Sequence, residues 1–189
     1  MIKSYDARQH WQMFSKALTD DIVNQIISVV DVTREAAIFT SNGNISVPNN
    51  DIRKSRVSWV KDKRILNLLY DYADVANKNA FGVHIYKKTD IQYTEYLASE
   101  SGHYSKHHDI DWNRNDGLDR KLSLTVQLSN PYEYEGGDFM FCNNTSPDKT
   151  LKEKGTILVF PSYLEHLVTP VTKGIRKSLV AWFEGPKWQ

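Results

Sequence analysis

The sequence predicts a single, mainly β domain preceded by α-helices, and three observations support this assignment. The chain has 189 residues, a length typical of one domain. Apolar residues recur at helical spacing in two segments before Asn79. The sequence after that point consists of short β-branched and aromatic runs separated by turn residues, which is typical of an antiparallel sandwich or barrel. We therefore expect residues 1–79 to form a helical support and residues 80–189 to form a β core.

Two amphipathic helices are predicted in the N-terminal part. The first covers residues 19–30, where Thr19 is a suitable N-cap and the apolar positions repeat with a period near 3.6. The second covers residues 62–76, which carry a similar apolar stripe. Between the helices, the segment RKSRVSWV (residues 53–60) follows turn-rich sequence and is predicted to form a strand.

Eight strands are predicted in the C-terminal part from their β-branched and aromatic residues. They cover residues 82–86, 91–97, 104–110, 122–128, 138–142, 156–160, 167–171 and 178–183. The pair Gly136 and Gly137 indicates a bulge or turn before a strand. Residues 111–120 form a polar connection, which is either a lid over a site or a solvated hairpin loop.

Composition excludes several classes of function. Lysine and arginine (24) nearly equal aspartate and glutamate (23), giving a net charge of +1, which argues against a nucleic-acid or membrane-surface partner. The one cysteine, Cys142, excludes an internal disulfide and a Cys-rich zinc site. The sequence has neither a signal-peptide pattern nor an apolar run long enough to span a membrane. We expect a soluble, cytoplasmic protein.

The densest group of metal-ligand side chains is GHYSKHHDID (residues 102–111). On a strand, His107 and Asp109 point to the same face, and His108 points to the other. One imidazole and one carboxylate placed in this way can bind a metal ion together. A third ligand from a distant strand would leave one face of the ion open, as in non-haem Fe(II) sites. Alone the signal is weak, because the H-x-D pattern occurs by chance.

The C-terminal segment supplies the missing groups. His166 follows a strand predicted to be buried, and Arg176 opens the last strand with Ser178, Val180 and Trp182 on its face. A guanidinium group binds a carboxylate with two parallel hydrogen bonds, and a hydroxyl adds a third donor. This pattern predicts an anchor for a carboxylate ligand near His166. The alternative is that Arg176 pairs with an acidic group on the surface.

Together these residues resemble the signature of Fe(II)- and 2-oxoglutarate-dependent dioxygenases, and more narrowly of the prolyl 4-hydroxylase-like branch. The H-x-D motif is followed by a histidine 57 residues after Asp109 and by Arg176 ten residues after His166. Collagen-type members carry lysine where this chain has Arg176. The resemblance covers most of the chain, through residues 53–60, 96–111, 134–139 and 166–182. It implies a double-stranded β-helix (jelly-roll or cupin-like) core flanked by helices.

The resemblance also implies roles for individual residues. His107, Asp109 and His166 would hold iron, and Arg176 would bind the distal carboxylate of 2-oxoglutarate with help from Ser178. Further residues are expected to line the cosubstrate or substrate pocket: Tyr96, Tyr104, Val168 and Trp182. The implied cosubstrates are 2-oxoglutarate and O2, with ascorbate as a stimulant, and the implied products include succinate and CO2.

The substrate implied by the resemblance is a protein or peptide, with a prolyl residue favoured. Residues 53–60 and 111–120, with Trp112 and Tyr132, would frame its groove. Two alternatives stay open. The same chemistry can act on a free amino acid, another small molecule or a nucleic-acid base, although the balanced charge argues against nucleic acid.

The second alternative is a non-catalytic, cupin-like module in which histidines hold a structural ion. The histidines concerned are His103, His107, His108 and His166. Arg176 and Ser178 argue against this module, and against a zinc hydrolase, because neither kind of site needs a carboxylate anchor.

Overall fold

The structure is a computed structural model that describes residues 9–36, 38–39, 46–47, 49–143 and 147–189. Its helical elements are α1 (Asp20–Ser28), α2 (Lys63–Ala76), η1 (Asn77–Phe81), η2 (Ala98–Glu100) and η3 (Lys149–Lys152). Its strands are β1 (Gln12–Phe14), β2 (Arg34–Glu35), β3 (Ile38–Phe39), β4 (Ser46–Val47), β5 (Arg53–Lys54), β6 (Arg56–Trp59), β7 (Thr89–Leu97), β8 (His103–His107), β9 (Leu118–Gln127), β10 (Tyr134–Gly136), β11 (Phe139–Phe141), β12 (Ile157–Pro161), β13 (His166–Val168) and β14 (Val171–Pro186).

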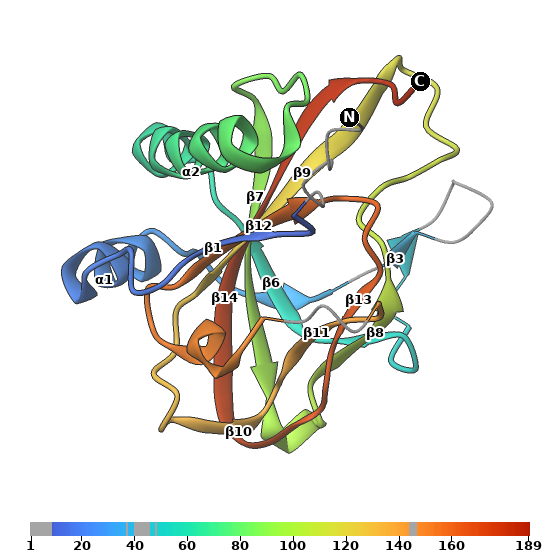
Figure 1. The fold of residues 1–189 in the computed structure, drawn as a ribbon. Coiled ribbons are helices and arrows are strands. Elements are labelled where there is room, and N and C mark those ends of the chain that lie inside the picture. The colour runs from blue at the N-terminus through green and yellow to red at the C-terminus, as the bar shows by residue number, and fades with distance from the viewer. Residues whose placement is uncertain (1–8, 37, 40–45, 48, 144–146) are drawn as a thin grey trace, which may run out of the picture.

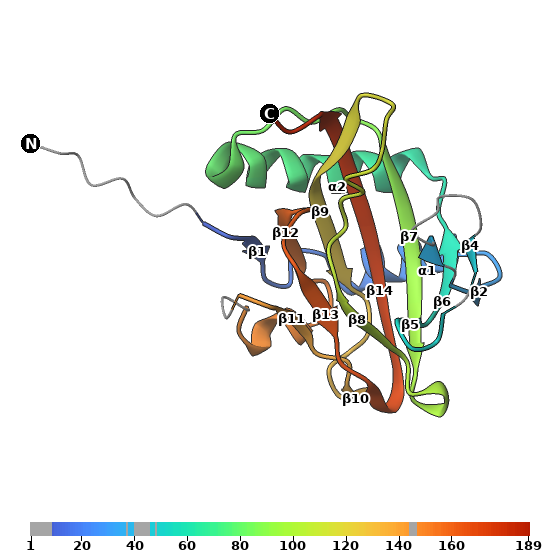
Figure 2. The same ribbon diagram turned by 90° about the vertical axis from the view of Figure 1, so that its right-hand side faces the viewer.

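Two antiparallel sheets face each other and form a double-stranded β-helix, which confirms the predicted fold. The large sheet has the order β1-β12-β9-β14-β7-β6-β2, with β10 attached to β14, and the small sheet has the order β11-β13-β8-β5. The helices α1 and α2 lie on the side of the large sheet that faces away from the small sheet (Figures 1 and 2). Within the described residues, no helix is long and apolar enough to cross a membrane.

The two faces of the large sheet differ in chemistry, because side chains alternate along each strand. On β9, Leu122, Leu124 and Val126 pack into the main apolar core with the helices. The intervening Ser123 and Thr125 are also buried, but they face the space between the sheets. The same alternation continues on β14, where Leu179, Ala181 and Phe183 belong to the main core and Ser178, Val180 and Trp182 line a cavity. The apolar core is therefore beneath the helices, and polar groups are held inside the β-helix.

Both predicted helices are present, with slightly different ends. Thr19 caps α1 and its side chain accepts a hydrogen bond from the backbone of Ile22 at 3.4 Å. Asp62 caps α2 in the same way, through the backbone N–H groups of Arg64 and Ile65. The helix continues through η1 and ends at Gly82, whose φ of 63° is in the left-handed region.

Residues 82–86, predicted as a strand, do not form one. The segment makes one backbone hydrogen bond to β14, from Tyr86 N to the Glu184 carbonyl at 2.8 Å. The Asn77 side chain binds both backbone polar groups of Val83 at 2.6 and 2.9 Å. Because these local bonds already satisfy part of the segment, its β-branched composition does not produce a ladder.

Other strand boundaries also differ from the predicted ones. Residues 53–60 form two strands in different sheets, with β5 paired to β8 and β6 paired to β7, because the chain crosses between the sheets at buried Ser55. The predicted strand 104–110 ends at His107, and 167–171 divides into the end of β13 and the start of β14. The glycine pair was correctly predicted as a bulge, since the β10–β14 register shifts between Glu135 and Gly136.

Candidate functional site

Three metal-ligand side chains meet between the two sheets. His107 ends β8 and His166 begins β13, and the two residues are partners in the small-sheet ladder. Asp109 lies two residues beyond the end of β8. One ligand atom from each side chain lies within 4.8 Å of the other two. The Nε2 atoms of His107 and His166 lie 3.6 and 3.8 Å from the Asp109 carboxylate oxygens. The structure therefore brings the predicted ligand set together.

Asp109 reaches this position by a different route from the one the sequence suggested. Because β8 stops at His107, strand alternation does not apply to Asp109. Instead, the backbone N–H groups of Asp109 and Ile110 both donate to the Ser162 carbonyl, at 2.9 and 3.2 Å. These two bonds fold the chain back over the start of the loop and turn the carboxylate toward the histidines.

Both imidazole rings are oriented by backbone carbonyl groups. His107 Nδ1 lies 2.8 Å from the Ser105 carbonyl, and His166 Nδ1 lies 2.8 Å from the Leu164 carbonyl. A carbonyl only accepts hydrogen bonds, so each Nδ1 carries the proton and each Nε2 keeps a lone pair for a metal. Burial and the nearby His166 lower the pKa of His107 to about 4. Burial opposes ionisation of Asp109, but His166, His107 and the hydroxyl of Ser123 together lower its pKa.

Aromatic rings hold the two histidines in place. The Tyr104 ring is stacked on His107, with 3.4 Å between ring centres and 13° between planes. Phe139 is stacked on His166, with 5.1 Å between centres. Burial raises the pKa of Tyr104 to about 12, so its hydroxyl stays protonated at neutral pH. Tyr104 therefore acts as a neutral wall of the site.

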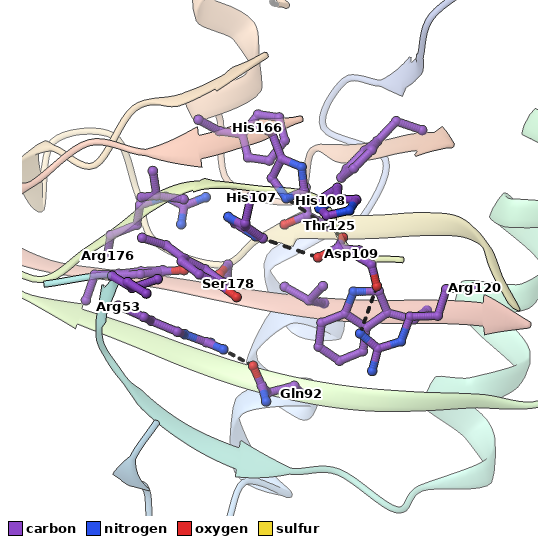
Figure 3. Close-up of a pocket in the computed structure, with 18 of the residues that line it drawn as sticks. Arg53, Gln92, His107, His108, Asp109, Arg120, Thr125, His166, Arg176 and Ser178 are labelled. Carbon is purple, nitrogen blue, oxygen red and sulfur yellow. Dashed lines mark hydrogen bonds and ion pairs between the residues drawn. The ribbon is translucent and has the colours of Figure 1, made fainter. Parts of the chain in front are cut away.

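A cavity of about 410 Å³ extends from these ligands between the sheets (Figure 3). It is lined by every pocket residue proposed from the sequence: Tyr96, Tyr104, Val168, Arg176, Ser178 and Trp182. Arg176 is only 4% exposed and its guanidinium lies 5.5 Å from the Tyr96 ring centre. No hydrogen bond or ion pair joins the Arg176 side chain to any residue that the structure describes. A buried guanidinium in this state is suited to a carboxylate ligand.

Several residues of the cavity were not singled out from the sequence. Arg53, Gln92, Arg120 and Thr125 all line it. Arg53 and Arg120 belong to segments 53–60 and 111–120, which were expected to frame the substrate groove, but neither residue had a role of its own. Gln92 and Thr125 alternate with apolar core residues on β7 and β9, so they were detectable as polar residues on the second face of each strand.

Other proposed residues lie at the edge of the cavity or outside it. His103 is at the start of β8, where its ring nitrogens face the carbonyls of Ser101 and Asp51 at 3.0 and 3.5 Å. His108 is exposed at the cavity edge. Tyr132 is 94% exposed and Trp112 is 57% exposed, and neither lines the cavity. The four-histidine cluster of the cupin-like alternative is therefore not assembled among the described residues.

The donor set fits a divalent transition metal. Two neutral imidazole nitrogens and one carboxylate on one side of an ion leave its other positions open, which is the pattern of non-haem Fe(II) sites. In the same cavity, Arg176 and Ser178 are donors suited to a carboxylate. The site can thus hold a metal and a small acid together.

Comparison with known proteins agrees with this geometry. The family model described as the 2OG-Fe(II) oxygenase superfamily matches residues 91–184. A PKHD-type hydroxylase of Verminephrobacter eiseniae is 34% identical over 91 residues, which cover 46% of this chain and 40% of the relative. The chain thus matches about two fifths of that relative's length.

Solved structures resemble the whole chain. A prolyl-4-hydroxylase of Pseudomonas putida has a TM-score of 0.67 at 17% identity, covering 93% of each chain. A prolyl hydroxylase of Trichoplax adhaerens, solved in complex with a hypoxia inducible factor peptide fragment, has a TM-score of 0.61 at 18% identity, covering 92% of this chain and 83% of the other. These similarities establish the shared fold.

Proposed function

Residues 91–184 of this chain match the 2OG-Fe(II) oxygenase superfamily, and from that premise we propose that it is an Fe(II)- and 2-oxoglutarate-dependent oxygenase that hydroxylates a prolyl residue in a peptide. The products besides hydroxyproline would be succinate and CO2. One observation carries this proposal. The His107, Asp109 and His166 ligand set and the unpartnered Arg176 guanidinium line the same cavity.

The residues of the cavity have distinct tasks in this proposal. His107, Asp109 and His166 would hold Fe(II), which supplies oxygen activation together with 2-oxoglutarate. Arg176 and Ser178 would bind the far carboxylate of the cosubstrate and fix its orientation toward the iron. Tyr104 and the aromatic side chains around it would exclude water from the reacting groups.

The cavity also has space and surface for a substrate side chain. Its volume of about 410 Å³ lies within the roughly 300–1,000 Å³ that is usual for small-molecule sites. Trp59 and Trp182 lie with their ring centres 6.2 Å apart at this cavity. Flat apolar rings suit a pyrrolidine ring, and the resemblance to prolyl 4-hydroxylases favours proline.

The proposal is tested first by anaerobic titration of the purified protein with Fe(II) and 2-oxoglutarate. A weak visible absorption band is expected when an Fe(II) ion with open coordination positions binds the 2-oxo acid. Admission of oxygen should then convert 2-oxoglutarate to succinate, and a screen of proline-containing peptides should show addition of one oxygen atom. Metal binding without the band or succinate would support a structural ion instead. Succinate formation without modified peptide would point to a small-molecule or nucleobase substrate.

A further inference from the structure

We propose that the substrate carries a carboxylate close to the carbon that is hydroxylated, and that Arg120 binds this carboxylate. The inference rests on the proposed function and narrows its substrate class to acidic peptides. It follows from the charges that line the cavity and from the partners of each charged group.

The cavity has an excess of positive charge. Three of its lining residues are arginines, Arg53, Arg120 and Arg176, and one is a carboxylate, Asp109. With neutral histidines, these side chains sum to +3 − 1 = +2. A ferrous ion and a doubly charged 2-oxoglutarate would cancel each other, so the excess of +2 stays. Unpaired charges in a partly dry cavity are costly, and an anionic substrate removes part of that cost.

Arg53 contributes charge but uses one edge of its guanidinium within the protein. Its side chain is 8% exposed, and Nε donates to Ser55 Oγ at 2.9 Å and Nη2 to Gln92 Oε1 at 2.8 Å. Its guanidinium lies 4.6 Å from the Tyr104 ring centre. All of these partners are neutral. Arg53 therefore makes the cavity more positive, while the edge formed by Nε and Nη2 is already used by Ser55 and Gln92.

In Arg120, the edge formed by Nε and Nη2 makes no hydrogen bond to any residue that the structure describes. Its guanidinium lies 4.2 Å from the ring centre of Trp182, and Nη1 makes one long hydrogen bond, 3.3 Å, to the Asp109 carbonyl. No carboxylate among the described residues pairs with it. Figure 3 shows Arg120 on the opposite side of Asp109 from Arg53 and Arg176. Arg120 is thus separated from the cosubstrate anchor and placed where a substrate meets the metal ligands.

Arginines elsewhere in the chain form ion pairs with acidic side chains of the same protein. Arg56 pairs with Glu100 at 2.5 Å, and Arg114 pairs with both Asp116 and Glu184 at 2.7 and 2.5 Å. The arginines of the cavity, in contrast, have no acidic partner at salt-bridge distance among the described residues. A guanidinium that lies over an aromatic ring and has a free edge is suited to bidentate binding of a carboxylate.

The test compares peptides that differ only in one charge. Each peptide has a central proline with glutamate before it, glutamate after it, or a free C-terminal carboxylate directly after it; the matched neutral peptides carry glutamine or a C-terminal amide. Binding is followed by tryptophan fluorescence of the Mn(II)-loaded protein with 2-oxoglutarate, because Trp59 and Trp182 line the cavity. One acidic peptide is expected to bind about 10- to 100-fold more tightly than its neutral counterpart.

Variants then assign the preference to its residue. Arg120→Gln should abolish the preference for the acidic peptide, and Arg120→Lys should keep part of it, since the charge is retained without the fork. Arg56→Gln is the matched control, because Arg56 is exposed on β6, and this variant should leave the preference for the acidic peptide unchanged. Three results would each overturn the inference. The first is equal binding of every acidic peptide and its neutral counterpart, and the second is no binding of any acidic peptide. The third is an equal loss of affinity for the acidic and the neutral peptide in Arg120→Gln.

Failure of the proposed function would look different. In that case the protein with Fe(II) would not convert 2-oxoglutarate to succinate, whichever peptide is added. If succinate forms and the charge preference is absent, the oxygenase assignment stands and the acidic substrate class is wrong.

Discussion

Ser123 Oγ donates a hydrogen bond to Asp109 Oδ2 at 2.6 Å, and it lies 2.9 Å from Ser162 Oγ. Because the Ser123 proton is used on the carboxylate, Ser162 donates to Ser123. Ser162 also accepts both backbone bonds that position Asp109. Both serines are fully buried. The carboxylate in the ligand set is thus fixed to β9 and to the end of β12, and it does not depend on the loop that carries it.

We therefore expect Ser123→Ala to weaken metal binding. Removal of a residue that orients a ligand typically costs 10- to 100-fold in metal affinity, and Mn(II) titration followed by calorimetry measures this loss. The control is Ser58→Ala, since Ser58 is also buried on the large sheet but makes no hydrogen bond to Asp109. Equal affinity of Ser123→Ala and wild type would show that the hydroxyl does not orient Asp109.

Arg176→Ala should weaken binding of 2-oxoglutarate and leave metal affinity unchanged. Hydrogen bonds to a charged group contribute about 1.5–3 kcal/mol, so the dissociation constant should rise about 10- to 100-fold, as measured by calorimetry on the Mn(II)-loaded protein. The dissociation constant of Arg176→Lys should lie between those of the wild type and Arg176→Ala, because lysine keeps the charge and loses the second parallel hydrogen bond. If the alanine variant bound 2-oxoglutarate normally, the anchor would be another cavity residue.

Gly174→Ala should destabilise the fold. Gly174 has φ of 68°, and a Cβ at this position would lie 1.9 Å from the Glu133 carbonyl oxygen, so the β10–β14 pairing has to shift. Gly117→Ala is the matched control, because Gly117 has φ of 81° and open space around it. Backbone strain costs about 1–3 kcal/mol in both variants. Urea unfolding should show a larger loss in free energy of unfolding for Gly174→Ala, and an equal loss would refute the steric argument.

The N-cap of α2 should make stability depend on pH in the acid range. The side chain of Arg64, and then the backbone N–H groups of Arg64 and Ile65, lower the pKa of Asp62 to about 2, from an ordinary value of 3.8. The ionised carboxylate therefore stabilises the fold above pH 4, and this contribution is lost as pH falls through about 2.

Asp62→Asn keeps a capping side chain and removes the titration. The difference in melting temperature between wild type and this variant should be constant above pH 4 and should shrink between pH 4 and 2. A difference that does not change with pH would contradict the assignment.

Much of the site was predictable from local sequence, for definable reasons. The H-x-D motif, His166 and Arg176 have metal- and carboxylate-binding chemistry at characteristic spacing, and the structure places all four side chains around one cavity. The inward position of Ser178 and Trp182 followed from strand alternation with Arg176. Their roles stay predictions until the measurements above are made.

The missed residues depend on contacts between distant segments. The site includes Arg53, Arg120 and Ser123 because β5 belongs to the small sheet and β9 to the large sheet. No local sequence pattern predicts that these strands lie close together. The strand predicted at residues 82–86 failed for a local reason, because the Asn77 side chain binds the backbone of Val83.

By itself, then, the sequence determined which residue types are present and which face of each strand they occupy, because both follow from covalent order and from the alternation of side chains. Only the tertiary structure decided where strands end, how Ser162 turns Asp109 toward the histidines, and that three arginines share a cavity with one carboxylate. Those features arise from hydrogen bonds and packing between segments far apart in the chain, which local sequence does not encode.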